Sequence, residues 1–279
     1  MVAATARDLR RPVPSFARAT LAGLNALVWG DAPARWVFLH GSALNAHTWD
    51  ATVVLLDRPA LAVDLPGHGE SPWRDDADYS PATLAPDVLD ALRAAVDVGL
   101  AEAPVTLVGQ SLGGLAALDV ARGDPTLFDR LVLVDVLPLP PAPEGHVAAF
   151  LTMPATFDSR DEIAARALGF GFAGPRAELD RAVWHNTREL PDGRVTWKHH
   201  FGHLDPRPLD LGDPDVAWRT IAELPCRVDL VWGTRSVTSE QSRARFAALR
   251  PTAAVTQIDS GHNIQEDAPH ALAQALARP

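Results

Sequence analysis

Short apolar runs alternate along the chain with longer segments that repeat apolar residues at helical spacing. The runs are rich in β-branched and aromatic residues and are bounded by glycine, proline and polar residues, a pattern that favours strands. We predict strands at Phe16–Thr20, Asn25–Trp29, Trp36–His40, Leu61–Leu65, Val105–Val108, Leu131–Val136, Val228–Trp232 and Ala254–Ile258. We predict helices at Thr83–Val98, Gly113–Arg122, Ser239–Leu249 and Pro269–Ala277.

This alternation predicts an α/β fold with a mostly parallel, eight-stranded sheet and helices on both faces. The first two runs have no helix between them, so the sheet is expected to begin with an antiparallel hairpin. The alternation breaks after Leu137, where four prolines follow within a few residues. We interpret residues 138–224 as a helical cap inserted after the sixth strand, which divides the α/β core into residues 1–137 and 225–279.

Aromatic residues are frequent in the predicted cap. One interpretation is that they form the cap's own core, and the other is that some of them line a substrate pocket. The pocket candidates are the aromatic residues Phe150, Phe157 and Trp184, together with Met153. If they do line it, the substrate is a small molecule with an apolar or aromatic group.

Composition and charge limit the classes of partner that this chain is expected to bind. The 279 residues are 47% hydrophobic and carry a net charge of −10, which argues against nucleic acid or an anionic membrane as a partner. Neither a signal peptide nor a membrane-spanning stretch is apparent. The single Cys226 excludes an internal disulfide, and we expect a cytoplasmic protein. The sequence does not determine the oligomeric state.

The sequence Gly109-Gln110-Ser111-Leu112-Gly113 follows the apolar run Val105–Val108 and precedes a helical pattern. A G-x-S-x-G motif in this context predicts a nucleophile elbow, a sharp strand-to-helix turn that exposes one serine hydroxyl. The glycines allow backbone to pack closely against backbone. Ser111 is therefore the predicted nucleophile.

A serine hydroxyl needs a base to remove its proton. His262 lies in the glycine-flanked loop Ser260-Gly261-His262-Asn263, directly after the last predicted strand. We predict His262 as the general base.

Together with His40-Gly41-Ser42 and Asp64–Ser71, these motifs resemble those of the α/β-hydrolase superfamily, in which the histidine follows the serine in sequence. The resemblance covers nearly the whole chain. It implies that the backbone N–H groups of Ser42 and Leu112 form the oxyanion hole. It also implies structural roles for His40 and for the turn Asp64–Ser71.

The acid that orients the histidine is not where the superfamily most often has it. That position is the end of Gly-x-x-Asp after the seventh strand, and here the sequence is Gly233-Thr234-Arg235-Ser236. Asp135 ends the sixth strand, at a spacing from Ser111 where other members carry an alternative acid. We predict Asp135 as the acid, although an aspartate there can also simply cap a loop.

The combination of Asp135 with Ser236 resembles a bacterial esterase and acyl-CoA thioesterase subfamily, which is also related to a mitochondrial hydrolase. In that subfamily a serine at this position joins the triad. Ser236 is therefore expected either to support the site by a hydrogen bond near Asp135 or His262, or only to fill space.

These residues predict a serine hydrolase that cleaves a carboxylic ester, thioester or lactone without a cofactor or metal. The turn His199–His203 has no acidic or cysteine ligand at useful spacing, and we expect a solvated turn there. Alternative functions are C–C bond hydrolysis or perhydrolysis by the same triad, or ligand binding by an inactive hydrolase fold.

Overall fold

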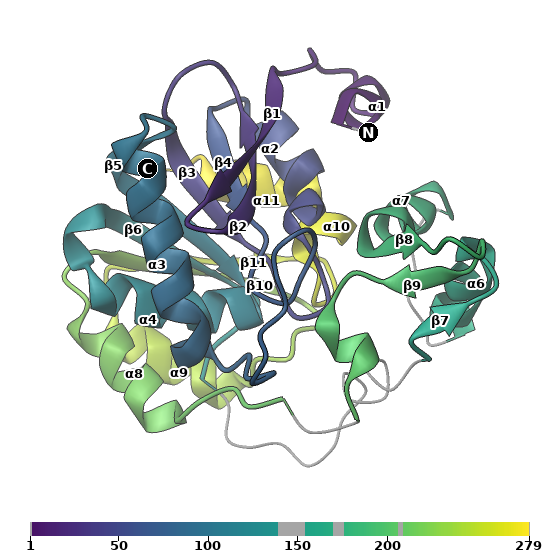
Figure 1. The fold of residues 1–279 in the computed structure, drawn as a ribbon. Coiled ribbons are helices and arrows are strands. Elements are labelled where there is room, and N and C mark those ends of the chain that lie inside the picture. The colour runs from purple at the N-terminus through teal and green to yellow at the C-terminus, as the bar shows by residue number, and fades with distance from the viewer. Residues whose placement is uncertain (1, 139–153, 170–175, 206–208, 279) are drawn as a thin grey trace.

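An eight-stranded sheet runs through the centre of the computed structural model, which describes residues 2–138, 154–169, 176–205 and 209–278 (Figure 1). Its strands, in spatial order, are β1 (Phe16–Leu21), β2 (Leu24–Trp29), β4 (Ala60–Val63), β3 (Ala34–Leu39), β5 (Ala101–Gln110), β6 (Phe128–Val134), β10 (Arg227–Gly233) and β11 (Val255–Ile258). β2 pairs antiparallel with β1 and β4, and the other pairs are parallel. The predicted sheet and its initial hairpin are confirmed.

Helices cover both faces of this sheet. One face carries α3 (Pro81–Asp97), α4 (Leu112–Gly123), α8 (Pro214–Glu223) and α9 (Glu240–Leu249), and the other carries α1 (Val2–Asp8), α2 (Asp50–Leu56), α10 (Ile264–Asp267) and α11 (Pro269–Leu276). Because successive strand residues point to opposite faces, Leu131 and Leu133 of β6 join one hydrophobic cluster. Val132 and Val134 join the other, so the sheet is buried on both sides.

The described part of the cap forms a small unit to one side of the sheet (Figure 1). It contains α6 (Arg160–Gly169), α7 (Arg176–Asn186) and a three-stranded sheet of β7 (Thr156–Phe157), β9 (Val195–Trp197) and β8 (Thr187–Glu189). Phe157, Ile163, Val183, Val195 and Trp197 form its own hydrophobic cluster. The expectation of a wholly helical cap missed this sheet, because strands of two or three residues are too short to show periodicity.

α8 lies inside the segment 138–224 that we assigned to the cap, but it packs with the core. Its buried residues Trp218 and Ile221 belong to the hydrophobic cluster that contains α3 and α4. This helix begins after Asp213, because Pro214 is its first residue and the Asp213 side chain accepts a hydrogen bond from the Asp215 N–H as its N-cap. The chain has therefore returned to the core before residue 214.

The turn His199–His203 is not the solvated turn that we expected. His200–His203 form the short 3-10 helix η3, and His199 is buried. The His200 ring stacks on Trp73, Lys198 forms an ion pair with Glu70, and the Tyr79 hydroxyl lies 2.7 Å from His200 Nδ1. The turn thus attaches the end of the cap to the loop after β4.

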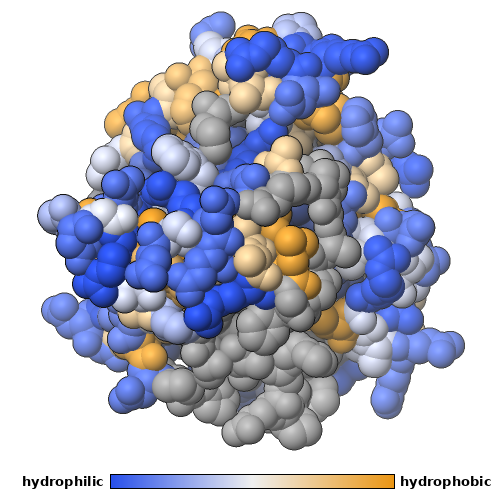
Figure 2. Space-filling view, turned by 90° about the vertical axis from the view of Figure 1, so that its right-hand side faces the viewer, coloured by the Kyte–Doolittle hydropathy of each residue, from blue (hydrophilic) through white to orange (hydrophobic). Residues whose placement is uncertain are grey.

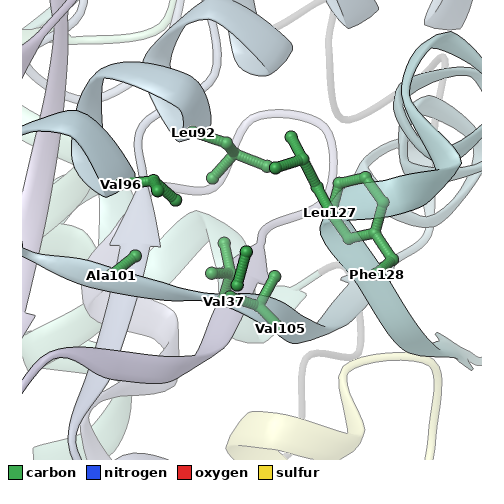
Figure 3. Close-up of a pocket in the computed structure, with 8 residues that line it drawn as sticks. Val37, Leu92, Val96, Ala101, Val105, Leu127 and Phe128 are labelled. Atoms are coloured by element: carbon green, nitrogen blue, oxygen red, sulfur yellow. The ribbon is translucent and has the colours of Figure 1, made fainter.

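A small apolar cavity lies near the amino end of β5, where Val37, Leu92, Val105 and Phe128 are among the lining residues (Figure 3). Its volume is about 10 Å³, the least space that holds a single water. It lies far from the carboxyl end of β5, where Ser111 is found. The cavity is a packing defect with no room for a substrate.

Among the described residues, the surface seen from the cap side is largely hydrophilic, with hydrophobic side chains near its centre and at its upper left (Figure 2). None of the helices within the described ranges has the length and apolar character needed to cross a bilayer.

The packing of α8 leads to a testable prediction. Ile221→Ala should lower the free energy of unfolding of the core by about 2–5 kcal/mol, because it leaves a cavity at a fully buried position. Denaturation monitored by circular dichroism measures this loss. Leu211→Ala, at an exposed residue before α8, is the control and should change stability little. An Ile221→Ala protein as stable as this control would contradict the assignment of α8 to the core.

Candidate active site

The turn between β5 and α4 places Ser111 in a strained backbone conformation, with φ of 51° and ψ of −122°. Neighbouring backbone atoms leave no room for a side chain at Gly109 or Gly113, the two motif glycines. A Cβ on Gly113 would lie 2.4 Å from the His40 carbonyl oxygen, and one on Gly109 would lie 2.5 Å from the Gly113 carbonyl oxygen. The two motif glycines are therefore required by close packing between the turn and the end of β3.

Positive φ angles gather around this turn. Among the described non-glycine residues with positive φ are Ala43, Ser111 and Asp135, which follow the ends of β3, β5 and β6. Strain of this kind persists only where the surrounding structure enforces it, and it is commonest at functional sites. The three neighbouring strand ends therefore mark one region of the molecule.

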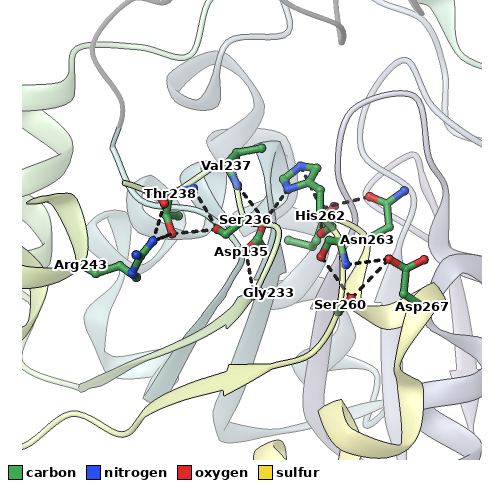
Figure 4. Close-up of polar contacts among 12 residues, drawn as sticks. Asp135, Gly233, Ser236, Val237, Thr238, Arg243, Ser260, His262, Asn263 and Asp267 are labelled. Atoms are coloured by element: carbon green, nitrogen blue, oxygen red, sulfur yellow. Dashed lines mark hydrogen bonds and ion pairs between the residues drawn. The ribbon is translucent and has the colours of Figure 1, made fainter. Parts of the chain in front are cut away.

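Asp135 is fully buried, and its carboxylate is surrounded by hydrogen-bond donors (Figure 4). Oδ2 lies 2.8 Å from His262 Nδ1, Oδ1 accepts a bond of 2.9 Å from the Gly233 N–H, and Oδ2 accepts a longer bond from the Val237 N–H at 3.5 Å. A buried carboxylate without such partners would be strongly destabilising. The structure thus brings the predicted acid and the predicted base together.

The loop that carries His262 is held by its own neighbours. The Asp267 carboxylate accepts the Gly261 N–H at 3.0 Å and the Ser260 hydroxyl at 3.4 Å (Figure 4). Because the Asp135 carboxylate can only accept, His262 Nδ1 carries the proton. The other nitrogen, Nε2, is then free to accept one. This is the tautomer that a general base requires.

Ser236 lies beside this pair, but its hydroxyl forms no hydrogen bond with either member (Figure 4). Its hydroxyl oxygen accepts the Thr238 N–H at 2.9 Å and lies 2.8 Å from Thr238 Oγ1. Such a turn shapes the loop so that the intervening N–H, that of Val237, reaches Asp135. Of the two alternatives for Ser236, a supporting hydrogen bond or a space-filling role, the hydrogen bond to Asp135 or His262 is not formed, and Ser236 supports the carboxylate through its loop.

Gln110, next to the predicted nucleophile, is the nearest partner of His262 Nε2 among the described contacts. Its Nε2 atom lies 3.3 Å from His262 Nε2 and donates to the His262 carbonyl at 3.3 Å. No hydrogen bond joins Ser111 Oγ to His262 Nε2 here. Bonds of this type are often open in a hydrolase without substrate. Sequence analysis gave Gln110 no role, although its position in the motif placed it at the site.

Ser42 and Leu112 lie where two neighbouring loops meet. Leu112 begins α4, directly after Ser111. Ser42 follows Gly41, and Gly41 lies so close to Ser111 that a Cβ on it would be 3.2 Å from Ser111 Cβ. Within the described residues, neither N–H is used in a hydrogen bond to another group of the protein. Both are therefore open to a ligand oxygen near Ser111.

Two side chains keep the Gly41–Ser42 loop in place. His40 Nδ1 donates to the Gly41 carbonyl at 2.8 Å, and its Nε2 accepts the Leu65 N–H at 3.0 Å. Asp64 accepts the Ala46 N–H at 2.7 Å and also bonds Asn25 and the Glu70 N–H. The structural roles expected for His40 and for the turn Asp64–Ser71 are confirmed, whereas the number of contacts that Asp64 makes was not foreseen.

The pocket candidates within the described residues, Phe157 and Trp184, differ in burial. Phe157 is buried in the cap's own cluster, as in the first interpretation of the cap aromatics. Trp184 is 52% exposed, with the Arg160 guanidinium 4.2 Å from its ring centroid. Phe150 and Met153 lie outside the described residues.

Comparisons with known proteins identify the family of this chain. Residues 36–275 match the model of the "Alpha/beta hydrolase family", and the chain belongs to this family. It is 34% identical to "Esterase Rv0045c" of Mycobacterium tuberculosis over 275 residues, which are 95% of this chain and 89% of that protein. The crystal structure of that esterase superposes with a TM-score of 0.83 over 99% of this chain and 94% of its own.

Other relatives match over shorter stretches or at lower identity. The "sn-1-specific diacylglycerol lipase ABHD11" of Mus musculus is 37% identical over 119 residues, 41% of this chain and 36% of that protein. A thioesterase domain from the curacin biosynthetic pathway shares the fold, with a TM-score of 0.72 at 22% identity, covering 95% of this chain and all of that one. The chain is thus an α/β-hydrolase enzyme, and its esterase and lipase relatives support hydrolysis of esters.

The buried histidines of the site region make stability depend on pH. Burial lowers the pKa of His40 to about 4, and burial together with the nearby His40 lowers that of His68 to about 3. Both stay neutral in the folded protein, whereas the unfolded chain binds protons below a pH of about 6.5. The free energy of unfolding should therefore fall between pH 6.5 and 4, by at most about 1.4 kcal/mol per pH unit for each histidine.

Urea denaturation at pH 7, 6 and 5 measures this slope. His40→Asn should reduce this slope by up to about 1.4 kcal/mol per pH unit, the contribution of one proton. His270→Gln, which changes an exposed histidine, should leave the slope unchanged. An equal slope in all three proteins would show that His40 is not held neutral by the fold.

Proposed function

We propose that this chain hydrolyses carboxylic esters through an acyl-enzyme on Ser111, with His262 as general base and Asp135 as the acid that orients it. The bond of 2.8 Å between His262 Nδ1 and the buried Asp135 carboxylate is the observation that carries the proposal. It favours one tautomer of His262 and stabilises the imidazolium that forms when the base takes a proton.

In the first half of the reaction, Ser111 Oγ attacks the ester carbonyl carbon and its proton passes to His262 Nε2. For this step Ser111 Oγ must replace the Gln110 amide as the partner of Nε2. The N–H groups of Ser42 and Leu112 hold the oxyanion. The bond from the carbonyl carbon to the alcohol oxygen then breaks, and the alcohol leaves with the proton from His262.

In the second half, a water molecule gives a proton to His262 Nε2 and attacks the acyl carbon. The bond to Ser111 Oγ breaks, His262 returns the proton to Oγ, and the carboxylic acid leaves. The site then has its starting protonation. All proton transfers use His262 Nε2, because His262 Nδ1 stays hydrogen-bonded to Asp135.

The nature of the substrate rests on the relatives and on the cap. "Esterase Rv0045c" matches nearly the whole chain, which favours esters over thioesters, lactones and C–C bonds. Phe157 packs inside the cap and Trp184 is largely covered by Arg160 on one face, so neither carries a claim about the acyl group. Short p-nitrophenyl esters are therefore the substrates for a first test.

Labelling by a fluorophosphonate probe tests the nucleophile. The wild-type protein should be labelled once and should hydrolyse p-nitrophenyl butyrate, and Ser111→Ala should lose both properties while keeping its circular dichroism spectrum. Ser236→Ala is the matched control and should still be labelled. A wild-type protein that folds but resists the probe would instead favour ligand binding on an inactive hydrolase fold.

The placement of the acid is tested by two substitutions of neighbouring residues. Asp135→Asn should lower kcat on the order of 10⁴-fold, because the amide no longer favours the required tautomer. Ser236→Ala should lower kcat less than about tenfold, since the donors to Asp135 are backbone N–H groups that remain. The reverse order of severity in steady-state kinetics would move the acid function away from Asp135.

A further inference from the structure

A second group of metal-ligating side chains lies at the boundary between cap and core, away from Ser111. His47 belongs to the 3-10 helix η1 (Ala46–Trp49), Asp50 begins α2, and His185 lies near the end of α7. One donor atom from each lies within 4.8 Å of the other two. α7 is the cap helix nearer the core (Figure 1), and Asn45 Nδ2 donates a hydrogen bond of 2.5 Å to Asn186 Oδ1 across the boundary.

His185 has an unused nitrogen at this place. The residue is 8% exposed, and its Nε2 atom is buried without a hydrogen-bond partner. A neutral imidazole has a lone pair on one of its two nitrogens, so a ligand can bind His185 at this unused atom.

Asp50 supplies a negative charge that the protein balances only in part. It is 2% exposed, and its hydrogen-bond partner in the described chain is His47 Nδ1, 3.1 Å from both carboxylate oxygens. The exposed Arg18 donates to His47 Nε2 at 2.8 Å, which leaves the His47 proton on Nδ1. A buried carboxylate next to two imidazoles is a favourable place for a cation.

We propose that His47, Asp50 and His185 bind one divalent transition-metal ion of the Zn²⁺ or Co²⁺ type, which ties the cap to the core. Two imidazoles and one carboxylate are a donor set that such ions prefer over Mg²⁺ or Ca²⁺. No metal site was expected from the sequence, because His185 lies far along the chain from the other two residues and no ligand spacing connects them.

Metal binding requires two local changes. The rings of His47 and His185 are stacked, with centroids 3.8 Å apart and planes 22° apart, so one ring must turn before both lone pairs meet at one point. The metal takes His47 Nδ1, and the single proton of that imidazole moves to Nε2, where Arg18 now donates. Arg18 must then leave, and as an exposed side chain it can do so into solvent.

Because Arg18 competes with the metal for His47, two variants should change metal affinity in opposite directions. Metal-free full-length protein is titrated with CoCl₂, and binding is followed by equilibrium dialysis and by the visible absorption bands of Co²⁺. The wild-type protein should bind one Co²⁺ per chain, which Zn²⁺ displaces. His185→Gln should weaken binding at least about tenfold, whereas Arg18→Ala should strengthen it, because no guanidinium then competes for His47.

Two variants distinguish this site from the other histidines. His270→Gln removes an exposed imidazole, and His262→Gln removes the proposed general base, and both should bind Co²⁺ as the wild type does. Thermal melting without metal establishes that each variant folds. The proposal fails if the wild type binds no Co²⁺, if His185→Gln binds it unchanged, if Arg18→Ala weakens binding, or if His262→Gln abolishes it.

Discussion

The parallel pairing of β5, β6 and β10 is the constraint on which the site depends. Gln110 at the end of β5 pairs with Val134 of β6, and Val134 pairs with Val231 of β10. Strands in this register end at one level, so the next residues of β5 and β6, Ser111 and Asp135, leave the sheet side by side. Both have a positive φ, because each chain must turn away at once from a fully buried sheet. The loop after β10 reaches Asp135 through the Val237 N–H.

Burial of the Asp135 charge explains how this chain manages without an aspartate at position 236. A buried carboxylate needs several donors, and it obtains them from His262, from the N–H of Gly233 at the end of β10 and from the Val237 N–H in the loop that follows. The loop therefore contributes its backbone to the acid and does not contribute a carboxylate. Ser236 shapes that loop through Thr238, which is a supporting task that a short hydroxyl side chain performs well.

Much of the core was predictable because parallel strands buried on both faces are nearly continuous apolar runs, and helices between them repeat every three to four residues. α1, α2 and the cap strands were not predicted, because they are short and their stability comes from packing on other elements. α8 lay within the segment assigned to the cap, and only its packing showed that it belongs to the core. At the site, Ser111 and His262 were recognisable from local motifs. The contacts of Gln110, Asp64 and Asp267 join loops that are far apart in sequence, and no local pattern indicates them.

The sequence by itself determined the strand-to-helix elbow at Ser111, the glycines it needs and the loop that carries His262, because these depend on residues that are neighbours in the chain. It also reduced the choice of acid, since Gly233–Ser236 contains no carboxylate. Only the tertiary structure decided which partners meet. The pairing of Asp135 with His262 joins β6 to the loop after β11, and the pairing of His47 with His185 joins core to cap. Such contacts depend on strand order and helix packing, which set distances that the spacing of residues along the chain does not contain.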